Sequence, residues 1–583
     1  MSDEEGVDFN WLDLIDTEHE SPWVRPDRVW LRKRPPEVAK TVKYPKLNGF
    51  PDFLKKSARD FPNNVCMHFP QLNNAKYTFY ETLYFADVLS NAFVQEFGIK
   101  KGDGIAVMTP NCPEFVFTVY ATGQTGGILV PVNYLLKKNE IKHIVDSSGI
   151  VKVFITDRQF YGMVKRASKE ANVEHIVKTS SDKEDDLTIA KLLEKYPPKR
   201  PNVKIDLKED LAGLLFTGGT TGLPKGVMIS HSNLISNCFQ FFGLAAAGAW
   251  KGSYEEAFKI VGSTRTITTN PLCHAMGFLI LNISIASGGS LIITTGFDPG
   301  LVLKMLEQYK ITSFTTVPTA YNFLINHPDF KTRDLSALET SGSGSAPLPY
   351  KVAQVWGERT GLKVTNGYGL TEVTCLCHWA QMWEEIDPKS IGFPVVDTDA
   401  KIVNPPDYIT ELEPGQQGEL LLRGPQVMKG YWRNPEATKK TLIEDENGNI
   451  WLSTGDVAYM DENGYFFIVG RTKEQIKYKG YRVLPAEVED GLFQHPAVLE
   501  CGVIGIPDEM AGETIKAFVK LKPEYEGKVT EQEIIDWAKE NMAAYKYPRF
   551  IEFIGMIPKT PVGKVKRREL LEKELKKIEA ANQ

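Results

Sequence analysis

The sequence predicts an α/β fold, with a large N-terminal domain of mixed, mainly parallel sheets and a small C-terminal α+β domain. Three observations support this prediction. The 583 residues exceed what one hydrophobic core usually serves, so at least two domains are expected. From about residue 50 to 341, short apolar runs alternate with helical patterns, which is typical of parallel strands joined by crossover helices. Beyond residue 470, short strands and helices are mixed without that alternation.

The composition is that of an ordinary globular protein, with 42% hydrophobic and 24% charged residues. A net charge of −6 argues against nucleic acid as the main partner, because binding to phosphate backbones needs a basic surface. The acidic start lacks a secretory signal, and the most apolar region, 278–294, is too polar for a membrane span. Seven cysteines, an odd number, indicate no disulfide framework. We expect a cytoplasmic protein without a transmembrane segment; peripheral membrane contact and a homodimer stay open.

Residues 1–45 are predicted to form an arm on the domain surface, with its tryptophans as anchors and its basic run at 32–36 in solvent. Residues 46–470 would form the large domain. Its first half contains a helix over 78–97, which opens with the capping box Thr78-x-x-Glu81. Further predicted elements are strands at 105–108, 128–132 and 151–156, helices at 113–123 and 138–147, and an exposed connection at 180–202.

The second half of the large domain contains another alternating set. Strands are predicted at 266–269, 290–295, 313–317 and 337–341, and we expect ligand-binding loops at their carboxyl ends. The segment 243–262 has no clear periodicity and is interpreted as an insertion. Residues 471–583 would form the small domain, with strands at 499–506 and 516–521, helices at 486–493 and 531–542, and a last helix from about Lys566.

The stretch 216–226 follows an apolar strand, 211–216, and has the composition of a phosphate-binding loop. Its glycines allow backbone N–H groups to approach an anion, its threonines add neutral donors, and Lys225 adds a positive charge. It is not a Walker loop, because Lys225 stands between Pro224 and Gly226. The near match to a dinucleotide fingerprint at 342–347 fails because Pro347 replaces its third glycine. Taken alone, a flexible surface loop remains the alternative for 216–226.

Five further segments accompany this loop in a fixed order. They are Ser-Gly-Ser-Ala-Pro at 343–347, Asn-Gly-Tyr-Gly-Leu-Thr-Glu at 366–372, Ser-Thr-Gly-Asp at 453–456, Gly-Arg-Thr-Lys-Glu at 470–474 and Pro-Lys-Thr-Pro-Val-Gly-Lys at 558–564. Together they resemble the adenylate-forming superfamily of acyl-CoA synthetases, beetle luciferases and amino-acid adenylation domains. The resemblance covers residues 50–575. Within the superfamily the sequence resembles AMP-forming fatty acyl-CoA synthetases of medium or long chain, while Lys477-Tyr478-Lys479-Gly480-Tyr481 is also found in 4-coumarate-type ligases and luciferase relatives.

The resemblance implies ATP, Mg²⁺ and coenzyme A as cofactors, and it assigns the nucleotide contacts. Thr220 and Glu372 would hold Mg²⁺ against the phosphates, while Tyr368 would stack on adenine and Asp456 and Arg471 would bind the ribose. The phosphate loop would contribute Thr217, Gly218, Gly219, Thr220, Thr221, Gly222 and Lys225, and the nucleotide slot Gly344, Ser345, Ala346, Asn366, Gly367, Gly369 and Thr371.

The small domain is mobile in the enzymes that the sequence resembles. Lys564 would bring a positive charge to the carboxylate and the α-phosphate, then leave as the domain rotates at Lys473-Glu474. In the second orientation Lys477, Lys479 and Gly480 would meet coenzyme A. Two positions depart from the common pattern: Gly218, where many members have serine, and Glu474, where aspartate is common.

His274 matches the position of an aromatic or histidine gate to the acid pocket; a core histidine is the alternative. The other expected wall residues are apolar, which predicts a hydrophobic acid. These residues are Met276, Phe278, Val317, Pro318, Cys375 and Leu376. The sequence Cys375-x-Cys377-His378 is interpreted as pocket wall and strand, because no second ligand cluster suggests a metal site.

The function predicted on this basis is ATP-dependent formation of acyl-CoA from a hydrophobic, medium- or long-chain fatty acid. Two alternatives stay open: an aryl-acid CoA ligase of the 4-coumarate or benzoate kind, and a nonenzymatic scaffold that binds acyl groups or nucleotides. An intact Lys564 argues against the scaffold.

Overall fold

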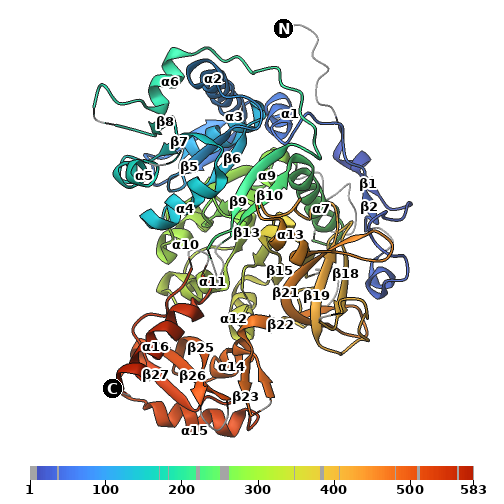
Figure 1. Ribbon diagram of the computed structural model, residues 1–583, viewed down its shortest axis with the longest axis vertical. Coiled ribbons are helices and arrows are strands. Elements are labelled where there is room, and N and C mark those ends of the chain that lie inside the picture. Colours follow the sequence, from blue (N-terminus) through green and yellow to red (C-terminus); the bar gives the residue numbers. More distant parts are fainter. Residues whose placement is uncertain are drawn as a thin grey trace.

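The structure is a computed structural model that describes residues 9–35, 38–169, 171, 173–181, 183–217, 223–249, 261–346, 348–380, 387–405, 407–479, 481–508, 512–560 and 563–581. In the described residues the chain folds into a large body with three large sheets and one two-stranded sheet, and a small C-terminal domain with a sheet of its own (Figure 1). The predicted fold class is confirmed. The domain boundaries at residues 45 and 470 stay predictions.

The first sheet has six strands in the order β10-β9-β6-β5-β7-β8. All neighbours are parallel except β9 and β10, which form an antiparallel hairpin around the phosphate-loop candidate. The strands are β5 (Gly104–Met108), β6 (Ile128–Pro131), β7 (Val151–Thr156), β8 (His175–Lys178), β9 (Leu211–Phe216) and β10 (Gly226–Ser230), and the associated helices are α3 (Pro113–Gln124), α4 (Lys138–Ser148), α5 (Tyr161–Ala167) and α6 (Ile189–Lys195). The predicted strands and helices of this region are confirmed within two residues. The exposed connection predicted at 180–202 instead contains α6, whose Ile189 and Leu192 are buried.

The second sheet has nine strands in the order β17-β16-β15-β14-β13-β11-β12-β3-β4, parallel from β15 to β3. Its strands are β3 (Val65–Phe69), β4 (Ala75–Thr78), β11 (Arg265–Thr268), β12 (Ser290–Ile293), β13 (Ser313–Thr316), β14 (Thr340–Ser343), β15 (Val364–Tyr368), β16 (His378–Trp379) and β17 (Phe393–Pro394). The strand predicted at 337–341 begins three residues later. The small residues of β14 carry no apolar pattern, so pairing with β13 and β15 sets its position.

Helices connect and cover this second sheet. They are α1 (Asp52–Asp60), α2 (Phe79–Phe97), α7 (His231–Ala249), α9 (Ala275–Ala286), α10 (Pro299–Gln308), α11 (Pro318–Ile325) and α12 (Tyr350–Thr360). The capping box predicted for α2 is present, with reciprocal hydrogen bonds between Thr78 and Glu81. Residues 243–249, interpreted as part of an insertion, continue α7; residues 250–260 lie outside the described residues.

A third, antiparallel sheet was not predicted. It pairs β18 (Asp399–Val403), β19 (Gly418–Arg423), β21 (Ile450–Met460) and β20 (Leu442–Glu444), with β22 (Phe466–Arg471) added to β21. This sheet matters for the site because β21 and β22 carry Asp456 and Arg471. The short helix α13 (Pro435–Thr441) lies just before it in sequence.

The C-terminal domain has its own sheet, β24-β23-β26-β25, extended by β27. Its elements are β23 (Ile476–Tyr478), β24 (Tyr481–Val483), β25 (Val498–Asp508), β26 (Gly512–Leu521), β27 (Phe550–Phe553), α14 (Pro485–Leu492), α15 (Glu531–Asn541) and α16 (Arg567–Ala581). Its apolar residues form separate clusters from the core of the body. The predicted α+β character is confirmed.

The N-terminal arm runs along one side of the body (Figure 1) through η1 (Trp11–Leu14), β1 (Ile15–Asp16), η2 (Val29–Lys33) and β2 (Thr41–Val42). Trp11 and Trp30 are buried in the core of the body, and Trp23 is half-buried, so their predicted role as anchors is confirmed. Arg32 and Lys33 of the basic run are exposed as expected, but Arg34 is half-buried and donates to the Pro394 carbonyl at 2.7 Å, so the prediction that the run lies in solvent is wrong at this residue. Across the described residues, none of the helices combines the length and apolarity needed to cross a bilayer.

Candidate active site

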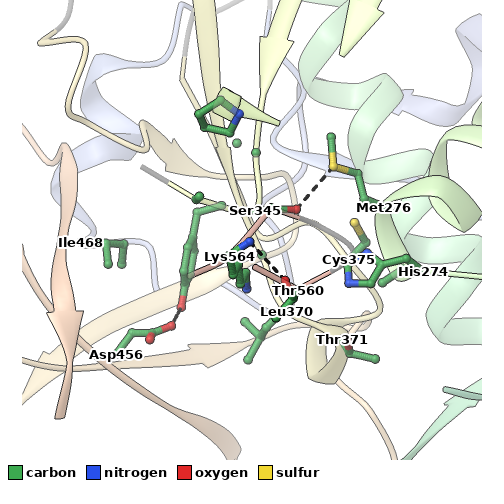
Figure 2. Close-up of a pocket in the computed structure, with 18 of the residues that line it drawn as sticks. His274, Met276, Ser345, Leu370, Thr371, Cys375, Asp456, Ile468, Thr560 and Lys564 are labelled. Carbon is green, nitrogen blue, oxygen red and sulfur yellow. Dashed lines mark hydrogen bonds between the residues drawn. The ribbon is translucent and has the colours of Figure 1, made fainter. Parts of the chain in front are cut away.

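A cavity of about 2270 Å³ lies where the three large sheets of the body meet the C-terminal domain. The large domain contributes loops at the carboxyl ends of β9, β13, β14 and β15, and the third sheet contributes β21 and β22. The C-terminal domain contributes the turn that holds Lys564 (Figure 2). The polar lining is concentrated at these strand ends, as expected for an open α/β sheet.

One corner of the cavity is formed by Asp456, Tyr368 and Arg471. The pairing of β21 with β22 sets Asp456 opposite Arg471, and the Arg471 Nε lies 3.0 Å from Asp456 Oδ1. The Tyr368 hydroxyl, at the end of β15, donates to Asp456 Oδ2 at 2.5 Å (Figure 2). Burial and the nearby Asp456 charge raise the pKa of Tyr368 well above its usual value. A carboxylate fixed in this way can accept hydrogen bonds from a diol.

Lys225 and Glu372 lie on either side of Tyr431, a residue that the sequence analysis missed. The Lys225 Nζ is 4.6 Å from the centre of the Tyr431 ring, and the Tyr431 hydroxyl donates to Glu372 Oε1 at 2.7 Å. Tyr431 is brought there by its backbone, which pairs with Val227 of β10. Because its neighbours in sequence form no recognised pattern, no sequence signal pointed to Tyr431.

The phosphate-loop candidate is closed by a hydrogen bond from the Thr217 N–H to the Lys225 carbonyl at 3.0 Å. Thr217 and Lys225 both line the cavity. The residues between them that were predicted to bind phosphate, Gly218, Gly219, Thr220, Thr221 and Gly222, lie outside the described residues. The structure therefore brings the two ends of the loop to the site.

The predicted nucleotide slot is brought together at the ends of β14 and β15. Its members Gly344, Ser345, Ala346, Asn366, Gly367, Tyr368, Gly369 and Thr371 all line the cavity. At Gly369 a Cβ atom would lie 1.5 Å from the Cys375 carbonyl oxygen, so the close chain approach here requires glycine. Ser345 adopts a positive φ of 72° and its hydroxyl contacts Met276 Sδ at 3.6 Å (Figure 2).

Lys564 reaches the same cavity from the C-terminal domain. Its turn is held by hydrogen bonds from Lys564 N to Thr560 Oγ1 (3.1 Å) and from Thr560 N to the Lys564 carbonyl (2.7 Å). Gly563 has a positive φ of 79° and packs near Thr319 at the start of α11. Burial, followed by the charge of Arg471, lowers the pKa of Lys564.

His274 immediately precedes α9 and lines the cavity near Lys564 (Figure 2). Its Nδ1 has no hydrogen-bond partner among the described residues. Burial, and then the Lys564 charge, lowers its pKa to about 4, so the ring is neutral at pH 7. A neutral ring beside Lys564 adds no competing positive charge.

The apolar wall matches the prediction in part. Met276, Pro318, Cys375 and Leu376 line the cavity. Phe278 and Val317 do not: Phe278 points away from the cavity into the core, where its ring packs against Phe50 at 6.4 Å. The reason is helix geometry, because Phe278 is two residues beyond Met276 and so faces the other side of α9. Among the described residues no group of three or more His, Cys, Asp or Glu side chains is arranged to hold a metal ion. Cys377 and His378 are both buried, and His378 lies in β16, as the interpretation of wall and strand expects.

The residues predicted to meet coenzyme A are not brought to the cavity. Lys477 and Lys479 are exposed on or beside β23, and Gly480 lies outside the described residues. The same domain presents its Lys564 turn to the cavity instead of β23. The predicted hinge does line the cavity, and there Arg567 donates to Glu474 at 2.8 Å.

Two family matches cover most of the chain. Residues 54–432 match the AMP-binding enzymes, and residues 487–564 match the C-terminal domain of AMP-binding enzymes. The chain belongs to the AMP-binding enzymes. It is an adenylate-forming, AMP-forming acid–CoA ligase, as its sequence resemblance predicted.

Similar proteins differ in the acid that their names give. The chain is 35% identical over 575 residues to a long-chain-fatty-acid–CoA ligase of Bacillus subtilis, covering 94% of this chain and 98% of that one. It is 34% identical over 478 residues to a feruloyl-CoA synthase of Amycolatopsis, covering 81% and 89%. A crystal structure of an anthranilate CoA ligase with anthranoyl-AMP superposes with a TM-score of 0.79 at 29% identity, covering 90% and 97%. The class of reaction is thus established, and the acid has to be argued from the cavity.

Proposed function

We propose that this AMP-binding enzyme uses ATP to convert a hydrophobic carboxylic acid, of the medium- or long-chain fatty acid class, into an acyl-adenylate and then an acyl-CoA. The observation that carries the proposal is the meeting of Lys564, Asp456 and Glu372 from separate elements in one cavity, with His274 beside them. The fatty-acid name of the Bacillus subtilis relative and the apolar side chains along α9 support the choice of acid.

In the proposed complex, Asp456 and Arg471 bind the two ribose hydroxyls, and Tyr368 lies against the base. The 2.5 Å hydrogen bond from Tyr368 holds the Asp456 carboxylate in place before the nucleotide arrives, so less ordering is needed on binding. Thr217 and Lys225, at the two ends of the glycine-rich loop, face the polyphosphate. We assign phosphate contacts within that loop to Thr220 and Thr221.

Glu372 is suited to hold a magnesium ion. One of its oxygens accepts the Tyr431 hydroxyl, and the other has no hydrogen-bond partner in the part of the chain that the structure describes. Mg²⁺ takes oxygen ligands and usually binds one or two carboxylates together with substrate phosphates. When bound, the ion would neutralise phosphate charge. We assign a second contact to the Thr220 hydroxyl.

The first half-reaction joins two anions, because the carboxylate oxygen of the acid attacks the α-phosphorus of ATP. A bond forms between that oxygen and phosphorus, and the bond from phosphorus to pyrophosphate breaks. The Lys564 ammonium, held in the cavity by its turn, stabilises the negative charge that develops between the two groups. His274 stays neutral and gates the acid. Burial and the Arg471 charge lower the pKa of Lys564, and the negative charge of the two anions would oppose this shift when they bind.

The second half-reaction transfers the acyl group to sulfur. The thiol of coenzyme A gives its proton to solvent, the thiolate attacks the acyl carbonyl, and AMP leaves with the electrons of the C–O bond. Lys564 has to leave first, because its turn occupies the space beside the acyl group. We propose that rotation near Lys473 and Glu474 then brings Lys477, Lys479 and Gly480 to the entrance.

The test is exchange of labelled pyrophosphate into ATP. We expect exchange that requires an added acid, with lauric and palmitic acids more effective than ferulic and benzoic acids, and acyl-CoA formation once coenzyme A is added. Exchange without any acid requirement, or none with any acid, would overturn the proposal.

An aryl acid is the second candidate. The feruloyl-CoA synthase relative favours it, and so do Phe241, Phe242 and Trp379, aromatic side chains that line the cavity and could stack on a planar acid. The same assay decides between the two, because kcat/KM for ferulic acid would then exceed that for lauric acid.

A further inference from the structure

The acid-binding part of the cavity has two walls of different chemistry. One wall is formed by α9 and the residue that caps it. The cavity-lining residues of this wall are Ala275, Met276, Leu279, Ile280, Ile283, Ser284 and the C-cap Ser287. The first five are apolar and lie toward His274; the last two are serines at the opposite end of the helix. The apolar character of this wall therefore ends before the cavity does.

The facing wall is the inner side of the parallel sheet, and it is lined by hydroxyls. Thr266, Ser313 and Thr340 are direct register neighbours on β11, β13 and β14, so their side chains project from the same face. All three line the cavity, whereas the intervening Ile267 and Phe314 lie in the apolar core on the other face. This sheet is thus amphipathic, with its polar face turned inward.

Both sets of hydroxyls lie at the same depth. The strands begin where α9 ends: Gly289, next to the start of β12, donates to the Ser284 carbonyl, and β12 runs parallel to β11. Thr340 lies four residues before Gly344, or about 13 Å along the strand. Ser287 lies eleven residues beyond Met276, or about 16 Å along the helix. The two distances, along the strand and along the helix, are similar. Both place the hydroxyls around the end of the cavity far from Lys564.

Several of these hydroxyls are unused. Ser284 is 5% exposed and lines the cavity, and neither its hydroxyl nor that of Thr266 has a hydrogen-bond partner among the described residues. Thr340 Oγ1 donates to Ser313 Oγ at 3.0 Å, which leaves the Ser313 proton available. A plain hydrocarbon end would bury these donors without a partner, and a buried donor without a partner is costly.

We propose that the acid carries a hydroxyl or carbonyl oxygen at the end far from its carboxylate, and that Ser284, Thr266 and Ser313 bind this oxygen. The substrate is then a fatty acid with an apolar chain and an oxygen atom at the end of the chain far from the carboxylate. This inference rests on the proposed function, since it assumes that the acid enters with its carboxylate at Lys564.

The experiment compares three acids in the pyrophosphate-exchange assay: lauric acid, ω-hydroxylauric acid and α-hydroxylauric acid. The wild-type enzyme should prefer the ω-hydroxy acid to lauric acid by about tenfold in kcat/KM, the scale of one buried hydrogen bond, and should not prefer the α-hydroxy acid. In the double variant Thr266→Val/Ser284→Ala the preference for the ω-hydroxy acid should disappear or reverse. Thr315→Val is the matched control, because Thr315 lines the same wall two residues nearer the carboxylate.

Each outcome separates the inference from the function beneath it. Equal exchange with all three acids would overturn the inference and keep the proposed function. A preference for lauric acid that the double variant leaves unchanged would do the same. In both outcomes water would hydrogen-bond to the hydroxyls. A lack of exchange with every acid in the wild type would overturn the proposed function itself. KM for ATP, unchanged in each variant, shows that the site has kept its fold.

Discussion

The two ends of this chain contact the same body in opposite ways. The N-terminal arm is part of the main core: Trp11 and Trp30 pack within the same apolar cluster as residues up to Phe466. Its polar contacts are buried as well, since the Asp397 carboxylate accepts hydrogen bonds from Ser21, Thr41, Tyr44 and the Val42 N–H. Burial raises the pKa of Asp397 despite these bonds.

The C-terminal domain has core clusters of its own, apart from the core of the body. Its core clusters draw on residues from Ile476 onward. It meets the body through polar contacts such as Asn322 Nδ2 to the Leu499 carbonyl at 3.4 Å, and through the Lys564 turn, where Gly563 lies beside Thr319. This difference in packing indicates which end of the chain can move. Moving the arm would expose buried tryptophans, whereas moving the C-terminal domain exchanges polar contacts for water, which costs much less.

The largest expected effect concerns the arm. Trp30 is fully buried and packs against Phe466 with ring centres 5.4 Å apart, so Trp30→Ala should destabilise the whole body by about 3–5 kcal/mol. Urea unfolding followed by circular dichroism measures this loss. Leu12→Ala, an exposed position of the same arm, is the control and should change stability by less than about 0.5 kcal/mol. A Trp30→Ala protein as stable as the Leu12→Ala protein would show that the arm is merely attached.

The next effect concerns the other end and should spare stability. Lys564→Ala should lower the rate of acyl-adenylate formation by about 100-fold, the scale for losing one preorganised charge, while ATP binding survives. Pyrophosphate exchange gives the rate, and calorimetry gives the affinity for ATP. Lys573→Ala, an exposed lysine of α16 paired with Glu569, should leave both unchanged. If Lys564→Ala weakened ATP binding as much as it slowed the reaction, the charge would serve binding instead.

The features that the sequence could predict are those with a local signal. Local signals predicted α2 from its capping box and most parallel strands from their apolar runs. The third sheet was missed because its strands are specified by long-range antiparallel partners, and β14 was displaced because Thr, Ser and Gly carry no apolar pattern. The binding motifs found most site residues. Tyr431 was missed because its position between Lys225 and Glu372 arises from pairing with β10, which no local pattern shows.

A smaller effect is the pH dependence of stability that buried histidines cause. The body has fully buried histidines, whereas His495 of the C-terminal domain is half-buried. Burial lowers the pKa of His231 to about 4 and that of His378 to about 3, and both side chains are fully buried. The unfolded chain therefore binds protons below its usual histidine pKa of about 6.5, while the folded body does not. Stability should be unaffected above that value and should fall as pH decreases from there toward 4, by about 1 kcal/mol per histidine at about pH 5.5.

Thermal unfolding at several pH values tests this expectation. Burial also lowers the pKa of His495 in the C-terminal domain, but this side chain is only half-buried, so His495→Ala should reduce the acid dependence by less than a change at a fully buried histidine. His378→Phe should reduce the dependence between pH 6.5 and 5 even if it lowers stability overall. An acid transition that begins in the C-terminal domain would contradict the comparison.

The smallest effect links the arm to the reaction without placing it in the site. The Trp11 ring lies 4.4 Å from that of Phe242, and Phe242 lies beside Phe241; both phenylalanines line the cavity. Trp11→Phe keeps an apolar ring but removes volume behind Phe242, so the wall can retreat. We expect a few-fold shift of kcat/KM toward longer acids, worth about 1 kcal/mol or less, with KM for ATP unchanged.

The same substitution distinguishes two roles for the arm. A clamp that only adds stability would lower the unfolding temperature and leave the order of preferred acids intact. A positioning element would change the order of acids, and the shift should vanish in a Phe242→Leu background, where the contact that transmits it is already gone. A shift that persisted in that background would mean that Trp11 acts through α7 as a whole. Whether the shift is transmitted through Phe242 or through α7 as a whole, the N-terminal arm would influence which acid is activated, while the C-terminal domain supplies the charge that activates it.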